Sequence, residues 1–186
     1  MSALPSGVMR EAQIDVGAIA SNVRHLKRLT GVEVIAVVKA DGYGHGAARA
    51  ALAALEGGAT RLGVADIDEA LALRRVGVMA PILAWLHAPG ASFVEAAGAG
   101  IEIGVSSFDQ LLAAAAAASI DRPTVVHLKL ETGLGRNGIA PADWGVVLSE
   151  AARLERIGRV RVEGIFSHLS NTSDEDDLAA LAEFER

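Results

Sequence analysis

The chain of 186 residues contains no cysteine, and aromatic side chains make up only 4% of it. The lack of cysteine excludes disulfides, thiolate catalysis and cysteine-ligated metals, and it is compatible with a reducing, cytoplasmic location. No apolar run approaches the roughly 20 residues of a membrane span. The N-terminus has no basic segment followed by an apolar one, so no secretory signal is expected. A formal net charge of −6 argues against nucleic acid as a partner.

Short apolar runs alternate with stretches rich in alanine and leucine, which is the rhythm of an α/β protein. The expected strands are Glu33–Lys39, Arg61–Ala65, Pro81–Trp85, Ile101–Val105, Thr124–Glu131 and Val160–Ser167. The expected helices are Gly46–Glu56, Asp66–Val76, Ala91–Ala99, Ser107–Ala118, Ala142–Arg156 and Asp174–Arg186. An earlier helix can begin after Asp15, and Glu11–Val16 could be an isolated strand. Six βα units in succession predict parallel strands joined by right-handed crossovers.

Both a doubly wound sheet and a (β/α)8 barrel would give this rhythm. A spacing of about 20–30 residues per unit favours the barrel, which typically needs roughly 250 residues to complete. The expected fold is therefore an incomplete TIM-type α/β barrel with about six of its eight units. We expect a strand and a helix in residues 1–32 and the partial barrel in residues 33–186. A sheet that does not close would expose two strand edges and an apolar interior, which favours aggregation.

The most informative segment is Ala36–Ala47, with the sequence AVVKADGYGHGA. Lys39 follows an apolar β-branched run, and three glycines, Tyr43 and His45 come directly behind it. Parallel α/β folds carry their reactive groups at the carboxyl ends of strands. Partial desolvation at such a position favours a neutral amine, which is the form that condenses with a carbonyl. Tyr43 can present its hydroxyl there, and His45 is either a proton carrier or a solvated loop side chain.

A second group of candidates lies in Val125–Ile139, VVHLKLETGLGRNGI. Residues 133–138 match GxGxxG, which alone suggests a dinucleotide site, but they follow the fifth strand and contain a bulky arginine. Arg136 is better interpreted as a donor to an anionic oxygen, or as the partner of Glu131 in an ion pair. Lys129 lies two residues before Glu131, so both should point to one face of the strand. A lysine that faces inward needs a partner or a modification that removes its charge.

His168 and Trp85 complete the set of candidates. His168 lies in the sequence GIFSHLSN after the sixth expected strand, and Trp85 ends the third strand, where its flat ring suits packing on a planar ligand. Each of these residues alone is more often structural than functional. Four such positions at the carboxyl ends of strands in one barrel indicate a site.

These residues resemble alanine racemase, a family of pyridoxal 5'-phosphate enzymes with a (β/α)8 barrel. AVVKADGYGHGA is similar to the family's cofactor-lysine signature, and LKLETGLGRNGI and GIFSHLSN are similar to its next two landmarks. With EAQIDVGAIASNVRHL near the N-terminus, the resemblance covers essentially the whole chain. It implies interconversion of L-alanine and D-alanine through a pyridoxal phosphate aldimine, which supplies D-alanine for peptidoglycan. Alanine is the family's usual substrate, and serine or a broader range stays open.

The resemblance also implies roles for the residues that match the signatures. Lys39 would bind the cofactor covalently and act as base and acid on one face of the substrate Cα. Tyr43 would bind the cofactor phosphate, and Trp85 would pack on the ring. Arg136 would contact the phenolic oxygen and the substrate carboxylate, while His168 would lie beside the pyridine ring.

In some members of the family the lysine that corresponds to Lys129 is carbamylated, which makes it an anion able to orient Arg136. Pairing of an unmodified Lys129 with Glu131 is the alternative. A tyrosine from the C-terminal β domain of the partner subunit serves the other face of the substrate, so the complete family enzyme is a homodimer.

That C-terminal β domain and the last two barrel units are not found in this sequence. We therefore expect an N-terminal portion with little or no activity alone, which a separate C-terminal chain could complete. One alternative is a non-catalytic pyridoxal-phosphate-binding barrel of the homeostasis type, although those proteins lack the DGYGHG string. Another is a nucleotide-dependent oxidoreductase that uses the GxGxxG match.

Overall fold

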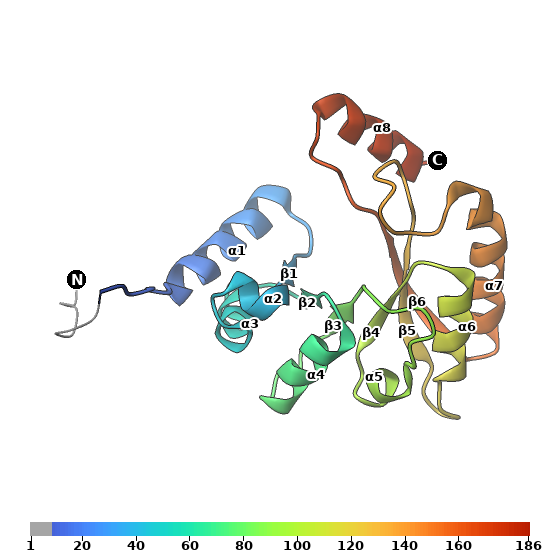
Figure 1. Cartoon of the computed structure of the whole chain (residues 1–186), viewed down its shortest axis with the longest axis horizontal. Coiled ribbons are helices and arrows are strands. Elements are labelled where there is room, and N and C mark those ends of the chain that lie inside the picture. Colours follow the sequence, from blue (N-terminus) through green and yellow to red (C-terminus); the bar gives the residue numbers. More distant parts are fainter. Residues whose placement is uncertain (1–8) are drawn as a thin grey trace.

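The computed structural model describes residues 9–186, and these contain one sheet of six strands with helices between them (Figure 1). The strands are β1 (Ile35–Val37), β2 (Arg61–Val64), β3 (Ile82–Ala84), β4 (Glu102–Val105), β5 (Thr124–Lys129) and β6 (Val160–Phe166). The helices are α1 (Val16–Thr30), α2 (Lys39–Tyr43), α3 (Ala47–Glu56), α4 (Ile67–Arg75), α5 (Val94–Gly98), α6 (Phe108–Ala116), α7 (Trp144–Arg156) and α8 (Asp174–Phe184), with a short 3-10 helix, η1 (Pro141–Asp143).

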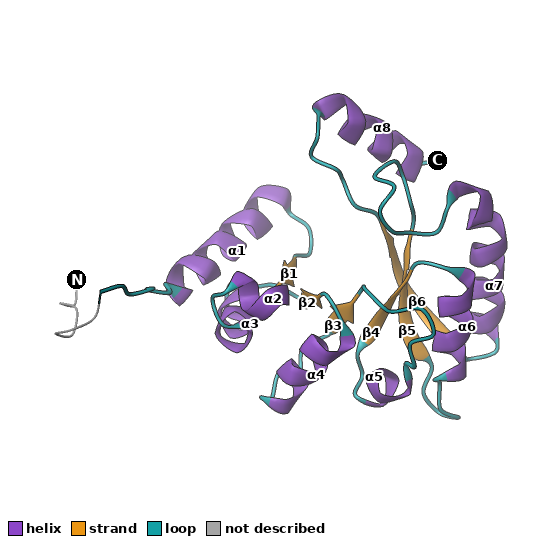
Figure 2. Cartoon of the chain, in the orientation of Figure 1, coloured by secondary structure: helices purple, strands orange, loops and turns teal. Residues whose placement is uncertain are grey.

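All neighbouring strands are parallel, and their order in the sheet is their order in the chain. Within residues 9–186, β1 pairs only with β2 and β6 only with β5, so the sheet is not closed. Figure 2 shows α4, α5, α6 and α7 along one side of the strands, with α8 set apart from them. The predicted incomplete α/β barrel with six βα units is therefore confirmed. None of the helices in the described part of the chain is long and apolar enough to cross a membrane.

The side chains that face the helices form the main core. Leu62 of β2 pairs with Ile82 of β3, Ile103 of β4 pairs with Val126 of β5, and all four are fully buried. Each side chain of this size contributes about 1.5–3 kcal/mol when it is taken from water. Because side chains alternate across a strand, the residues between these positions point to the opposite, concave face of the sheet.

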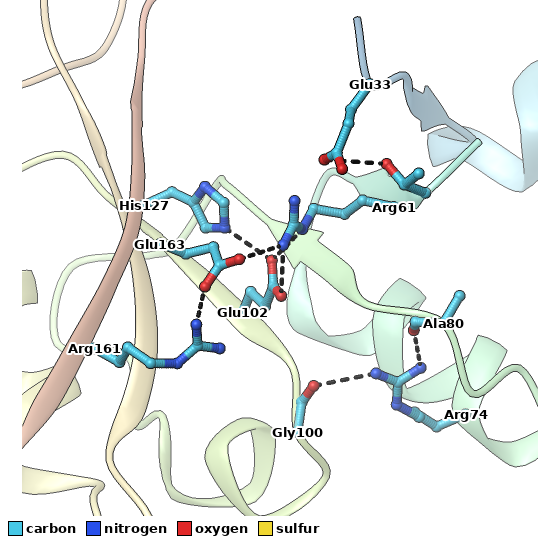
Figure 3. Close-up of polar contacts among 10 residues, drawn as sticks. Glu33, Arg61, Arg74, Ala80, Gly100, Glu102, His127, Arg161 and Glu163 are labelled. Carbon is cyan, nitrogen blue, oxygen red and sulfur yellow. Dashed lines mark hydrogen bonds and ion pairs between the residues drawn. The ribbon is translucent and has the colours of Figure 1, made fainter. Parts of the chain in front are cut away.

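Charged side chains occupy part of that concave face (Figure 3). Arg61 donates from Nε to Glu102 at 2.6 Å and from Nη2 to Glu163 at 3.0 Å. The Nε2 atom of His127 lies 2.8 Å from the same Glu102 carboxylate. Burial alone would raise the pKa of Glu102, but the hydrogen bonds and charges of His127 and Arg61 outweigh it and hold that pKa below its usual range. The buried Glu102 carboxylate is thus paired, as a buried charge must be.

Two predictions at the N-terminal side differ from the structure. The strand expected at Glu11–Val16 is wrong, because Asp15 accepts the Ala18 N–H at 2.9 Å and begins α1, and residues 11–15 form no strand. Residues 1–8 of the expected N-terminal unit lie outside the described residues. β1 is shorter than expected because its chain leaves the sheet at Val38, and Lys39 already begins a turn.

Two further elements have different ends. The fifth strand stops at Lys129, since Glu131 donates its N–H to the Ile139 carbonyl at 3.0 Å and the chain turns into a loop. The helix expected at Ala142–Arg156 is divided into η1 and α7.

Candidate active site

The predicted site residues lie at the carboxyl ends of four strands. Lys39 comes shortly after β1, Trp85 directly follows β3, Lys129 ends β5, and His168 comes shortly after β6. Since parallel strands end at the same edge of a sheet, the fold brings these four segments together. These residues therefore lie at one end of the barrel, as expected from the sequence.

The cationic side chains of this edge influence one another. Partial burial, followed by the positive charges of Arg136, Lys129 and Lys39, lowers the pKa of His168 below its usual range. Such charge effects weaken with distance, so they agree with the placement of these groups at the same edge of the sheet. We refer to Lys39, Lys129, Arg136 and His168 as the cationic cluster.

Lys129 is the buried member of the cationic cluster, with 5% of its surface exposed. Burial and then the charge of Arg136 lower its pKa, while Glu131 acts in the opposite direction. Within residues 9–186, neither Lys129 nor Arg136 forms an ion pair with a carboxylate. The ion pairs of Glu131 with Lys129 or Arg136, which the sequence left open as alternatives, are therefore not found in this part of the chain: the carboxylate is engaged elsewhere.

Glu131 instead holds the loop that follows β5. Its carboxylate accepts the Gly133 N–H at 2.6 Å. Burial would raise the pKa of Glu131, but backbone N–H groups of Gly135, Gly133 and Arg136, together with the charge of Lys129, lower it below its usual range. The backbone N–H groups of the loop that matches GxGxxG thus bind the Glu131 carboxylate. They are therefore not free to bind a pyrophosphate.

The turn after Lys39 is held by its own polar groups. Asp41 accepts the Ala47 N–H at 2.7 Å and so caps α3. His45 donates from Nδ1 to the Gly42 carbonyl at 2.8 Å, which supports a structural role for this histidine. Tyr43 is 60% exposed, and the Nζ atom of Lys39 lies 5.9 Å from the centre of its ring. The amine and the phenol therefore lie on the same side of the turn.

Trp85 lies on the concave face, across glycines of two other strands. A Cβ atom on Gly63 would lie 2.4 Å from Cζ3 of Trp85, and one on Gly104 would lie 2.9 Å from its Cβ. No side chain fits at position 63 while the indole stays in place, and none fits at position 104 while the backbone of Trp85 stays in place. Gly63 of β2 thus makes room for the indole ring, and Gly104 of β4 makes room for the Cα and Cβ atoms of Trp85.

A cavity of about 740 Å³ opens beside the cationic cluster. It lies between the loop after β5 and helix α8, and its lining includes Glu131, Leu134, His168, Asp176 and Glu183. Of the predicted residues, Glu131 and His168 border it, while Lys39, Tyr43, Trp85, Lys129 and Arg136 do not.

Reasoning from sequence missed two residues that shape this region. Glu69 accepts the Ala40 N–H directly after Lys39, at 2.7 Å. The signal was present, because Asp66 and Glu69 have the spacing of a capping box. His127 faces the same side of β5 as Lys129, and the alternation in VVHLKL could have placed it on the concave face.

The order of the strands, the helices between them and the cluster of cations at their carboxyl ends define a protein of the parallel βα-barrel class. Residues 14–186 match the family model described as alanine racemase, N-terminal domain, and the chain belongs to that family.

Individual relatives agree with this assignment. The chain is 49% identical over 179 residues to the alanine racemase of Thermobifida fusca, a match that covers 94% of this chain and 47% of that protein. The chain is also 49% identical to the alanine racemase of Mycolicibacterium smegmatis, in a match that covers 93% of this chain and 46% of that protein. The structure of alanine racemase from Streptomyces lavendulae superposes with a TM-score of 0.87 at 38% identity, covering 92% of this chain and 46% of that one. The chain thus spans about half the length of the curated relatives it matches.

Proposed function

We propose that this chain forms the lysine-bearing part of a pyridoxal-phosphate-dependent amino-acid racemase that interconverts L-alanine and D-alanine. The observation that carries the proposal is the cationic cluster: Lys39 follows β1, Lys129 ends β5, Arg136 lies in the loop after β5, and His168 follows β6, all at the carboxyl edge of one sheet. Neither Lys129 nor Arg136 has a carboxylate partner within residues 9–186. Such a cluster is stabilised by an anionic ligand.

The donor set fits pyridoxal 5'-phosphate. The cofactor carries an aldehyde, a phosphate, a phenolic oxygen and a flat ring. Lys39 supplies the amine, Tyr43 a hydroxyl for the phosphate, and Arg136 a donor for the phenolic oxygen. His168 and Trp85 supply a polar and an apolar surface for the ring.

Lys39 and Arg136 would have different roles in the reaction. When bound, pyridoxal phosphate serves as an electron sink that makes the Cα proton of an amino acid acidic. Lys39 then takes up and returns a proton at the substrate Cα from one face only. Arg136 holds the substrate carboxylate, which fixes the Cα proton relative to Lys39.

We further propose that Lys129 is carbamylated. Its lowered pKa favours the neutral amine, whose Nζ attacks carbon dioxide and loses a proton to give a carbamate anion. The anion would sit beside Arg136 and remove the unfavourable charge of a buried, unpaired lysine. Labelling with ¹³C-bicarbonate should give a carbamate signal that Lys129→Ala removes and that Lys27→Ala leaves in place.

Proton transfer on the second face requires another group. The sequence contains a single tyrosine, Tyr43, and it is assigned to the phosphate. We propose that a second copy of the complete protein supplies the other acid–base group, so the working unit is a homodimer. We place the activity in the cytoplasm, which agrees with a chain free of cysteine.

Exchange in deuterium oxide tests the proposed activity on the complete protein loaded with cofactor. L-alanine and D-alanine, supplied separately, should each gain deuterium at Cα and yield the other enantiomer, and Lys39→Ala should abolish both. Deuterium uptake with retention of the starting enantiomer would contradict racemisation. Cofactor binding without any exchange would favour the non-catalytic, homeostasis type of barrel.

A further inference from the structure

The segment that carries Lys39 has an unusual backbone. Ala40, Asp41, Gly42, Tyr43 and Gly44 have φ angles of 51°, 53°, 63°, 54° and 82°. Five consecutive residues thus lie in the left-handed region, which is unfavourable for residues that carry a Cβ. A run of this kind persists only where its surroundings hold it in place.

Glu69 is the side chain that ties this left-handed turn to the rest of the barrel. One of its carboxylate oxygens, Oε1, accepts the Ala40 N–H at 2.7 Å, and the other, Oε2, accepts the Ala65 N–H at 2.8 Å. Asp66 in turn accepts the Glu69 N–H at 2.9 Å and fixes the start of α4. One carboxylate therefore joins the chain after β1 to the chain after β2.

The start of α6 offers a direct comparison. Ser107 accepts the Gln110 N–H at 3.2 Å, and the Gln110 side-chain oxygen accepts the Ser106 N–H at 2.8 Å. This is the same capping arrangement, but it satisfies one N–H outside the helix where Glu69 satisfies two. An amide has one acceptor oxygen and a carboxylate has two, so glutamine suffices at position 110 and glutamate is needed at position 69.

We propose that Glu69 is a positioning residue for Lys39, an inference that rests on the proposed function. The Ala40 N–H belongs to the peptide group that immediately follows Lys39. Its hydrogen bond to Glu69 fixes the orientation of that peptide, and with it the direction in which the Lys39 side chain leaves the backbone. Without this bond the left-handed turn relaxes and the amine loses its place in the cationic cluster.

The test compares Glu69→Gln with Gln110→Ala in the full-length protein. Glu69→Gln keeps the size of the side chain but leaves one N–H facing an amide nitrogen. Gln110→Ala removes a capping bond of the same kind, remote from Lys39 in sequence, and controls for a loss of helix capping. The measurements are hydrogen exchange at Ala40 without cofactor, the midpoint of thermal unfolding, and the rate of the borohydride-trapped pyridoxal phosphate adduct on Lys39.

Glu69→Gln should speed exchange at Ala40 and slow adduct formation about tenfold, since small displacements of a reacting group have large effects on rate. Gln110→Ala should lower the unfolding midpoint without changing either quantity at Lys39. Unchanged exchange or an unchanged adduct rate in Glu69→Gln would overturn the proposal, as would equal slowing in both variants. An unsubstituted protein that forms no adduct would overturn the proposed function itself, while the exchange rates would still decide whether Glu69 holds the turn.

Discussion

At the scale of single residues, the cationic cluster concentrates positive charge, and within residues 9–186 neither Lys129 nor Arg136 forms an ion pair. His168 reports on this charge because Arg136, Lys129 and Lys39 act on its pKa together with burial. Trp85 adds a flat surface on the concave face, in the space left by Gly63. Packing alone does not explain the cationic cluster, because its positive charges repel one another.

The pKa of His168 should therefore respond to charge. We expect NMR titration to show it below its usual range in the unliganded protein. It should rise in Arg136→Gln, because a neighbouring positive charge is removed, and rise on addition of inorganic phosphate. Arg153→Gln, an exposed substitution on α7, is the control and should leave it unchanged. An Arg136→Gln protein in which His168 titrates as before would show that the two side chains are not coupled.

Substitution of Gly63 tests the placement of Trp85. Gly63→Ala should displace the indole and destabilise the fold by about 1–3 kcal/mol, which is typical of overpacking. Trp144→Phe leaves Trp85 as the sole tryptophan, and in that background Gly63→Ala should change the fluorescence of Trp85. Gly145→Ala is the control, since a Cβ there meets no atom within 4 Å. Equal stability and unchanged fluorescence in Gly63→Ala would contradict the observed packing.

At the scale of elements, local signals predicted helix starts well and failed where the backbone depends on distant groups. Asp15 and Ser107 were expected to begin helices, and each accepts an N–H from the first turn that follows. The left-handed turn after Lys39 was not predicted, because the residue that holds it, Glu69, lies on another βα unit. Local propensity would favour other conformations for Ala40 and Asp41.

The strands themselves hold a buried ion pair on their concave face, and its loss should be costly. Glu102→Gln leaves His127 without a carboxylate partner and Arg61 with Glu163 alone, and breaking a buried pair typically costs about 3–5 kcal/mol. The more exposed Glu163 offers a matched control, and Glu163→Gln should cost about 0–1 kcal/mol. Urea unfolding at neutral pH measures both.

The same pair gives a dependence on pH. Because the pKa of Glu102 is lower in the folded state, its carboxylate stabilises the fold above the usual carboxyl range, and this stabilisation is lost as the pH falls through the folded value. The free energy of unfolding should fall less steeply at acidic pH in Glu102→Gln than in the unsubstituted protein. An acid limb of the same steepness in both proteins would contradict this origin.

At the scale of the whole molecule, the sequence was sufficient for the parallel order of six strands and for the edge at which the site lies. Alternation of apolar runs with helical stretches carries that information, and each βα unit is short enough to be recognised. The pairing of Lys129 with Glu131, left open as an alternative, is not found in residues 9–186, because β5 ends at Lys129 and the Glu131 carboxylate accepts the Gly133 N–H. The polar network around Arg61 was not predicted, because its members come from four strands that are far apart in the sequence.

The open sheet leaves apolar side chains of β1 on the concave face partly exposed, among them Ile35 and Val37. The site nevertheless gathers residues from four strands and from the loops that follow them. Its central feature, the amine of Lys39, can thus be tested on the chain as it stands.

The most direct test is titration of the protein with pyridoxal 5'-phosphate, followed by borohydride reduction and peptide mass mapping. The sequence contains only three lysines, Lys27, Lys39 and Lys129, so the adduct can be assigned without ambiguity. We predict a stoichiometric adduct on Lys39, with Lys27 and Lys129 unmodified. An adduct on another lysine, or none in a folded sample, would contradict the assignment of Lys39 as the cofactor-binding residue.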